Sequence, residues 1–255
     1  MKSRDFLQEI IERKKKEVQG LMDKCSFTPQ VKAVSGRFRS ALVGETLSII
    51  AEIKRGSPSG GMIDATLDAR SLGKEYTQAG ASAISVLTDE TYFAGSLSDV
   101  EEVRGFGVPI LRKEFIIDPV QIVESAFYGV TAVLLIVAIL KERVGEFIEK
   151  ANIMGLETLV EVHTMEELAI ALEAKAPIIG INHRDLRTLT VDLSLGERIR
   201  KEIPSHVITV AESGIESAKE AMRLREMGFD ALLVGSALVR SSNRKKLIEE
   251  MRYGC

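Results

Sequence analysis

Residues 49–59 read IIAEIKRGSPS, and they place two opposite charges in a segment that is otherwise typical of a buried strand. Side chains alternate between the faces of a strand, so Ile50, Glu52 and Lys54 are predicted to share one face. Burying unpaired charges costs several kcal/mol per ion, so a purely structural role for this pair would be energetically expensive. The turn at 56–61, GSPSGG, offers hydroxyls and backbone amides that suit an anion, although a structural ion pair is the alternative.

The same kind of apolar run recurs along the chain, and segments with helical periodicity separate the runs. Strands are predicted at 47–54, 83–88, 108–113, 132–137, 157–162, 178–182, 206–212 and 231–235. Helices are predicted at 67–79, 119–128, 141–154, 165–175 and 217–227. This alternation predicts an α/β fold, a parallel (β/α)8 TIM barrel. An open doubly wound sheet is the alternative, but no G-x-G-x-x-G motif follows the first strand.

The composition predicts one domain over residues 1–255. Hydrophobic residues make up 45% of the 255 residues, and the six prolines are spread along the chain without marking a linker. Residues 47–255 would form the barrel and residues 1–46 an N-terminal helical extension across one end of it. Ser3 can cap the helix of this extension, whose apolar stripe consists of Phe6, Leu7, Ile10, Ile11 and Val18.

Charge and cysteine usage exclude several classes of partner. The net charge of −3 does not favour nucleic acid, and we expect Lys14-Lys15-Lys16 to form the solvated face of a helix. The apolar run 132–140 is too short to cross a membrane, and no signal-peptide core is present, so we expect a cytoplasmic protein without a membrane partner. Cys25 and Cys255 are predicted to be free thiols, and we expect no cofactor or metal.

Charged and amide side chains stand where several predicted strands end, which is where barrel enzymes carry their catalytic groups. The candidate catalytic residues are Glu52, Lys54, Lys113, Glu161, Asn182 and Glu212. Any one of them could belong to an ordinary ion pair at a strand end. A ring of five charges from four strands is hard to explain as packing, and it predicts an active site.

The last two predicted strands end in a glycine and a serine each. Ser213-Gly214 and Gly235-Ser236 stand where strand passes into helix, so their backbone N–H groups can face a ligand at the positive end of a helix dipole. Glycine in a tight turn also has a purely steric explanation. Because barrels commonly bind phosphate after strands seven and eight, the two pairs together predict a phosphate site, which Ser57 and Lys54 could complete.

Several motifs resemble the indole-3-glycerol phosphate synthase family of tryptophan biosynthesis. They are 50–55 (IAEIKR), 57–59 (SPS), 87–90 (LTDE), 92–93 (YF), 111–116 (LRKEFI), 159–163 (LVEVH), 180–182 (GIN) with Arg184 and Leu186, 211–215 (AESGI) and 233–238 (LVGSAL). Two departures stand out. Gly60 occupies a position where many members carry lysine, and His183-Arg184-Asp185 replaces the more usual Asn-Arg-Asn.

The resemblance implies closure of the pyrrole ring of 1-(o-carboxyphenylamino)-1-deoxyribulose 5-phosphate, with loss of carbon dioxide and water. Lys113 would be the general acid, with Lys54 as an alternative, and Glu161 would serve dehydration. Lys54 would hold the substrate carboxylate while Glu52 orients both lysines, and Asn182 and Glu212 would bind the ribulose hydroxyls and anilino nitrogen. The substrate-binding residues would be Ser57, Pro58, Phe93, Phe115, Arg184, Leu186, Ser213, Gly214, Leu233, Gly235 and Ser236.

Three other functions are compatible with a phosphate-binding barrel. A sugar-phosphate isomerase of the phosphoribosylanthranilate type would need a cysteine near the first strand's end and an aspartate near the sixth, where this chain has Glu52 or Lys54 and Asn182. A lysine-dependent aldolase could form a Schiff base on Lys54 or Lys113. A non-catalytic scaffold would be expected to lack the charged ring. The expected partner is a small phosphorylated substrate, and a monomer is the working expectation for the oligomeric state.

Overall fold

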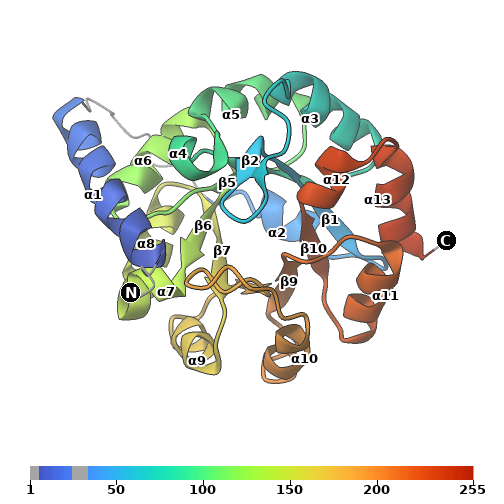
Figure 1. The fold of residues 1–255 in the computed structure, drawn as a ribbon. Coiled ribbons are helices and arrows are strands. Elements are labelled where there is room, and N and C mark those ends of the chain that lie inside the picture. Colours follow the sequence, from blue (N-terminus) through green and yellow to red (C-terminus); the bar gives the residue numbers. More distant parts are fainter. Residues whose placement is uncertain (1–5, 25–33, 255) are drawn as a thin grey trace.

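In the computed structural model, which describes residues 6–24 and 34–254, eight parallel strands close into a barrel (Figure 1). Strand β1 pairs with β10 on one side and with β4 on the other, so that Ile50 lies opposite Leu233 and Ala83. The strands of the barrel are β1 (Ser48–Ile53), β4 (Ala83–Leu87), β5 (Ile110–Lys113), β6 (Ala132–Ile136), β7 (Glu157–Val162), β8 (Ile178–Asn182), β9 (Ile208–Glu212) and β10 (Ala231–Val234). The predicted barrel is therefore confirmed.

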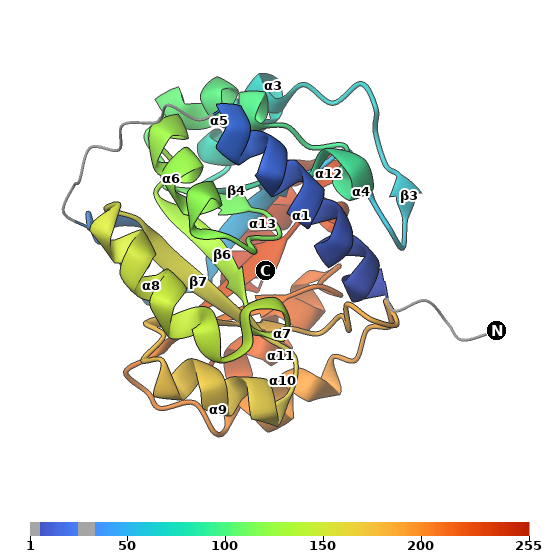
Figure 2. The ribbon, with the colours of Figure 1, turned by 90° about the vertical axis from the view of Figure 1, so that its left-hand side faces the viewer.

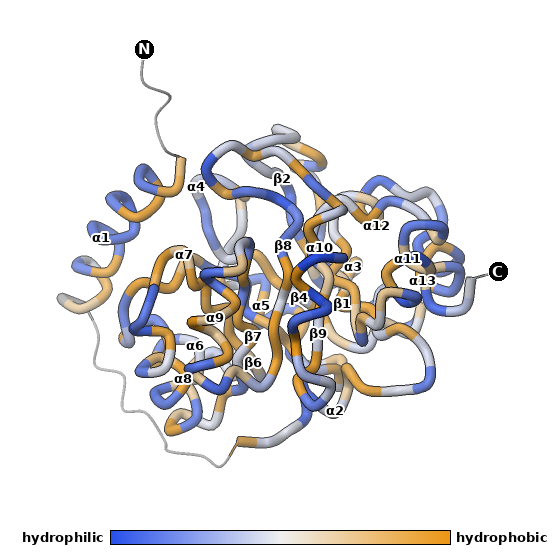
Figure 3. The backbone as a smooth tube through the Cα atoms, turned by 90° about the horizontal axis from the view of Figure 1, so that it is seen from below, coloured by the Kyte–Doolittle hydropathy of each residue, from blue (hydrophilic) through white to orange (hydrophobic). Residues whose placement is uncertain are grey.

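The strand alternation separates two hydrophobic clusters. Ile50, Leu111 and Leu159 belong to a cluster inside the barrel, while Ile49 and Ile53 belong to the cluster between strands and helices. Both faces of each strand are thus buried, as expected for a parallel sheet that helices surround. The strands are mostly hydrophobic, whereas the helices alternate hydrophobic with hydrophilic residues (Figure 3).

Helices cover the outside of the barrel, and their ends carry the expected capping residues. Asp118 and Gln121 form a capping box at the start of α6, and Ser217 and Glu220 form another at α11. The outer helices are α3 (Ala69–Gln78), α5 (Leu97–Val103), α6 (Pro119–Tyr128), α8 (Val144–Ile153), α9 (Met165–Glu173), α10 (Ser194–Arg200), α11 (Ala218–Glu226) and α13 (Arg244–Tyr253). Among the helices described, none has the length and apolarity needed to cross a bilayer.

Short elements complete the connections, and most of them escaped sequence analysis because a single turn has no detectable periodicity. They are β2 (Gly56–Ser57), β3 (Gly61–Met62), α4 (Glu90–Phe93), η1 (Arg104–Phe106), α7 (Val137–Leu140), η2 (Lys141–Arg143) and α12 (Ser236–Arg240). Helix α2 (Arg37–Ala41) covers the end of the barrel where the strands begin. There Glu157 accepts hydrogen bonds from the backbone N–H groups of Phe38 and Arg39.

Helix α1 (Phe6–Lys24) lies beside the opposite end of the barrel, where the strands terminate (Figure 2). The prediction that Lys14 is solvated is wrong, because its side chain is only 4% exposed. Its Nζ lies 2.7 Å from Asp89 Oδ2 and 2.9 Å from Glu114 Oε1. Lys14 follows Ile10 by one helical turn and so shares its buried face. The predicted cap Ser3 and both cysteines lie outside the described residues.

Candidate active site

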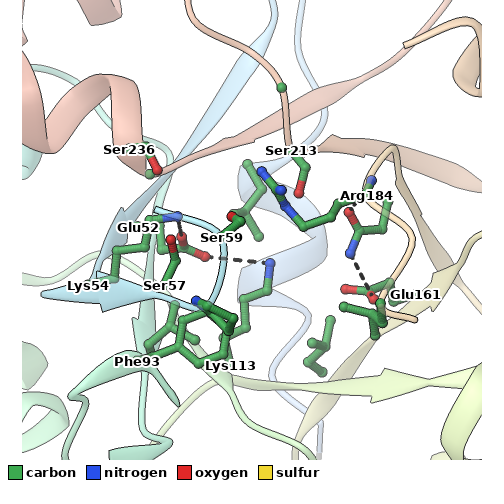
Figure 4. Close-up of a pocket in the computed structure, with 18 of the residues that line it drawn as sticks. Glu52, Lys54, Ser57, Ser59, Phe93, Lys113, Glu161, Arg184, Ser213 and Ser236 are labelled. Atoms are coloured by element: carbon green, nitrogen blue, oxygen red, sulfur yellow. Dashed lines mark hydrogen bonds and ion pairs between the residues drawn. The ribbon is translucent and has the colours of Figure 1, made fainter. Parts of the chain in front are cut away.

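A pocket opens where the barrel strands end, and it collects side chains from nearly every strand (Figure 4). Parallel strands bring their carboxyl ends to the same rim, so residues far apart in the sequence meet there. Sixteen of the predicted site residues line this pocket: Glu52, Lys54, Ser57, Pro58, Phe93, Lys113, Phe115, Glu161, Asn182, Arg184, Leu186, Ser213, Gly214, Leu233, Gly235 and Ser236. The predicted residues thus share one pocket, and their functional roles stay predictions.

The remaining predicted residue, Glu212, lies differently from expectation. Its side chain is fully buried and does not line the pocket, although it was expected to bind substrate hydroxyls or the anilino nitrogen. Instead, Glu212 Oε2 accepts a hydrogen bond of 2.7 Å from Lys113 Nζ. Gly180 leaves room for this carboxylate, because a Cβ at residue 180 would collide with Glu212 Oε1. Glu212 thus supports Lys113 from beneath.

Two lysines share the carboxylate of Glu52. Lys54 Nζ lies 2.8 Å from Glu52 Oε1, and Lys113 Nζ lies 3.5 Å from Glu52 Oε2. Burial alone would raise the pKa of Glu52, but both lysines outweigh burial and hold its pKa below the ordinary value. Glu52 is therefore a carboxylate near neutral pH, and it can orient both ammonium groups.

Two neighbouring carboxylates hold Lys113 in its protonated form. Burial opposes the charged form, yet the nearby Glu212 and Glu52 outweigh burial and raise the pKa of Lys113 above its ordinary value. An ammonium so placed can stabilise a negative oxygen and donate a proton to it. Because the raised pKa makes Lys113 a weak acid, the arrangement suits proton transfer to an oxygen that has already gained negative charge.

Glu161 has the opposite electrostatic setting. Burial and the charge of Glu212 raise the pKa of Glu161 to about 8, although Lys113 acts in the other direction. Asn182 Nδ2 donates a 3.0 Å hydrogen bond to Glu161 Oε1, and Asn182 Oδ1 accepts one from the backbone N–H of Arg184. Asn182 therefore fixes a carboxyl group that can exchange protons near neutral pH.

Apolar side chains form one wall of the pocket. The rings of Phe93 and Phe115 are 6.0 Å apart between centroids, and Phe6 of α1 lines the same pocket. Phe6 also packs edge-on against Tyr92, with centroids 5.1 Å apart. Sequence analysis missed Phe6, Glu114, Leu134 and Ile136 as lining residues. Phe6 was predicted only on the apolar stripe of a helix, Leu134 and Ile136 only within a strand, and Glu114 only within the 111–116 motif.

The predicted phosphate loops lie at the rim, but their geometry differs in two ways from expectation. Helix α11 begins only at Ala218, so Ser213-Gly214 forms a turn well before that helix, with φ of 67° at Ser213 and 75° at Gly214. Gly235 directly precedes α12, which has just five residues. A Cβ at residue 235 would also lie 2.9 Å from Lys54 Nζ and would collide with Glu52.

Solved structures with similar folds are also known. A thiamine phosphate pyrophosphorylase from Pyrococcus furiosus matches with a TM-score of 0.60 at 16% identity, covering 80% of this chain and 93% of that one. At such low identity the likeness supports the fold alone.

Comparisons of the sequence are more specific. Residues 7–251 match the family profile described as indole-3-glycerol phosphate synthase. An indole-3-glycerol phosphate synthase of Dehalococcoides mccartyi is 49% identical over 205 residues, covering 78% of this chain and 79% of the relative. One of Caldanaerobacter subterraneus subsp. tengcongensis is 41% identical over 255 residues, covering 98% and 100%. The chain belongs to the indole-3-glycerol phosphate synthase family.

Proposed function

We propose that Lys113 is the general acid of the family reaction, in which an aromatic carbon attacks the substrate ketone and closes the pyrrole ring. The observation that carries this assignment is the protonated Lys113 ammonium, held by Glu212 and Glu52 at the pocket floor. As the carbon–carbon bond forms, the ketone oxygen gains negative charge and takes a proton from Lys113. Carbon dioxide then leaves the attacking ring carbon, and the electron pair of the broken carbon–carbon bond returns to the aromatic ring.

Glu161 is the proton acceptor for the dehydration that follows. Loss of the new hydroxyl as water requires removal of a proton from the ring system. Because the pKa of Glu161 is about 8, only its deprotonated fraction can take up this proton, and that fraction grows as the pH rises through about 8. Asn182 keeps the carboxyl in place through its 3.0 Å hydrogen bond and presents its own polar atoms to the substrate hydroxyls.

Lys54 holds the substrate carboxylate until it leaves as carbon dioxide, and Glu52 orients Lys54 and Lys113 for their separate tasks. Phe93 and Phe115 pack against the anthranilate ring, together with Leu186 and Leu233. This division follows the pocket itself, which has charged groups on its floor and aromatic rings on one wall.

The phosphate binds at the rim formed by Ser57-Pro58, Ser213-Gly214 and Gly235-Ser236, with Arg184 as a nearby cation. These three turns line one pocket with the charged floor, and each can present backbone N–H groups or hydroxyls to phosphate oxygens. The family acts on a small phosphorylated substrate. We further propose a single-domain monomer in the cytoplasm, where a phosphorylated metabolite is retained.

The decisive experiment mixes the purified protein with 1-(o-carboxyphenylamino)-1-deoxyribulose 5-phosphate and follows indole fluorescence. Appearance of the fluorescent product at stoichiometric yield supports the assignment, and its loss in Lys113→Ala ties the reaction to this site. Borohydride trapping provides the counter-test. A covalent substrate adduct on Lys54 or Lys113 would replace general-acid catalysis with Schiff-base chemistry.

A further inference from the structure

His183 is a buried histidine outside the pocket, and nothing in the proposed chemistry uses it. It directly follows β8, and its side chain is completely inaccessible to solvent. Its ring Nδ1 lies 3.1 Å from the backbone oxygen of Ser213, and its backbone N–H donates a 3.0 Å hydrogen bond to the oxygen of Glu212. His183 therefore hydrogen-bonds two successive backbone carbonyl groups at the end of β9.

The bond to Ser213 fixes the hydrogen on the imidazole. A backbone carbonyl can only accept, so Nδ1 must donate. Burial lowers the pKa of His183, which favours the neutral ring. Among the described residues, Nε2 has no hydrogen-bond partner, and it faces Gly196, where a Cβ would collide with it. The imidazole ring therefore makes a hydrogen bond through Nδ1, while Nε2 packs against Gly196.

The bonded carbonyl belongs to a strained residue of the phosphate rim. Ser213 has a φ of 67°, a conformation that non-glycine residues adopt at a cost and keep only where neighbours enforce it. The C=O of Ser213 and the N–H of Gly214 belong to one planar trans peptide and point in opposite directions. The C=O points to His183, which does not line the pocket, so the Gly214 N–H lies on the side of this peptide away from His183, and both Ser213 and Gly214 line the pocket.

A similar hydrogen bond between a histidine ring and a backbone carbonyl occurs one strand earlier. His163 directly follows β7, and its Nδ1 lies 2.7 Å from the backbone oxygen of Asn182 at the end of β8. In both cases the residue after one strand holds a carbonyl at the end of the next. The two histidines serve different parts of the pocket, because Asn182 contacts Glu161 whereas Ser213 belongs to the phosphate rim.

We propose that His183 is a positioning residue for the phosphate site, holding the Ser213 carbonyl so that the Gly214 N–H faces the ligand. The inference rests on the phosphate site proposed above. Replacing His183 by Leu removes the donor, while Asn offers a side-chain N–H at a similar distance from the backbone. The loss of one hydrogen bond corresponds to a five- to tenfold effect, about 1 kcal/mol.

The experiment measures the competitive inhibition constant of inorganic phosphate, together with KM and kcat, in the full-length protein. We expect His183→Leu to raise the inhibition constant and KM by about five- to tenfold, with kcat changed less than about threefold. His183→Asn should restore both constants to within about twofold. His163→Leu is the matched control, since it removes the same kind of bond and should leave phosphate inhibition unchanged.

A folded His183→Leu protein with unchanged phosphate inhibition would overturn the proposal, as would an equal loss in His163→Leu. If phosphate does not compete with substrate in the native enzyme, the proposed phosphate site itself is wrong. That result differs from a failure of the His183 proposal, in which the native enzyme is inhibited and His183→Leu is inhibited equally. Nitrogen NMR of the native histidines tests the bond without any variant. The expected spectrum shows His183 protonated on Nδ1 and bare on Nε2, and the opposite tautomer would refute the arrangement.

Discussion

Lys113 Nζ lies 2.7 Å from Glu212 Oε2, and the Glu212 side chain is completely buried. A charge-assisted hydrogen bond to a buried carboxylate fixes the ammonium both in position and in protonation state. The second carboxylate, Glu52, lies 3.5 Å away, so Lys113 has one tight partner and one looser one. The looser contact faces the pocket and leaves the ammonium able to reach a substrate oxygen.

Replacing Lys113 by Ala should therefore lower kcat by about 10²- to 10⁴-fold, the usual contribution of a general acid, while KM changes much less. The reason is that the proton is donated mainly in the transition state. Steady-state kinetics of the purified variant measure both constants. Near-normal turnover would remove Lys113 from the mechanism.

Lys54→Ala should act chiefly on KM, because Lys54 is proposed to hold an anionic group already in the ground state. Glu52 keeps Lys113 as a partner in this variant, so Glu52 retains one of its two ion pairs. Parallel kinetics of Lys54→Ala and Lys113→Ala make the comparison. An unchanged Michaelis constant in Lys54→Ala contradicts the binding role.

The local sequence predicts where Glu52, Lys54 and Lys113 lie for two reasons. Strand alternation depends only on neighbouring residues, and the ends of parallel strands share one rim of the barrel. Alternation placed Glu52 and Lys54 on one face of the first strand, and the shared rim of strand ends placed Lys113 near them. It could not tell that Glu212 would lie beneath Lys113, because that contact depends on the stagger between distant strands and on the space above Gly180. The prediction that Lys14 is solvated was wrong because it gave the lysine charge more weight than the helical spacing from Ile10. That spacing places Lys14 on the buried face of the helix.

The raised pKa of Glu161 makes two pH effects testable. As a proton acceptor Glu161 must be deprotonated, so kcat/KM should rise with pH through about 8 and lose this inflection in Glu161→Gln. Stability should change in the opposite direction. The folded pKa lies above the value of 4.5 for the free group, so its stabilising contribution is complete below pH 4.5 and lost as pH rises through about 8.

Thermal unfolding of both proteins between pH 5 and pH 9 measures the second effect. The native protein should lose stability relative to Glu161→Gln as pH rises, because the amide cannot ionise. Parallel stability curves together with an unaltered rate profile would identify Glu161 as structural.

Lys14→Met should destabilise the protein by about 3–5 kcal/mol, because it leaves Asp89 and Glu114 buried without their cation. Lys15→Met is the matched control on the same helix, since Lys15 forms an exposed ion pair with Glu12 and its loss should change little. Denaturant unfolding compares the two variants. Equal effects would show that the buried contacts of Lys14 do not anchor α1.

Phosphate binding gives the last prediction, and the structure decides which variant can test it. A side chain at Gly235 would disturb Glu52 and Lys54 as well as a ligand, so Gly235→Asp cannot separate the phosphate rim from the charged floor. Ser236 lines the pocket at the start of α12. Ser236→Asp therefore adds a negative charge beside the proposed phosphate oxygens, and Ser242→Asp adds the same charge just beyond α12, at a residue outside the pocket lining.

Inorganic phosphate should inhibit the native enzyme competitively and stabilise it by roughly 2.7 kcal/mol at a hundredfold excess over the dissociation constant. Ser236→Asp should abolish both effects, since the new carboxylate repels the anion, and residual turnover should show a greatly raised KM. Ser242→Asp should behave like the native protein in thermal shift and inhibition assays. If Ser236→Asp is still stabilised by phosphate to the native extent, the phosphate binds elsewhere, and the rim formed after β9 and β10 has another role.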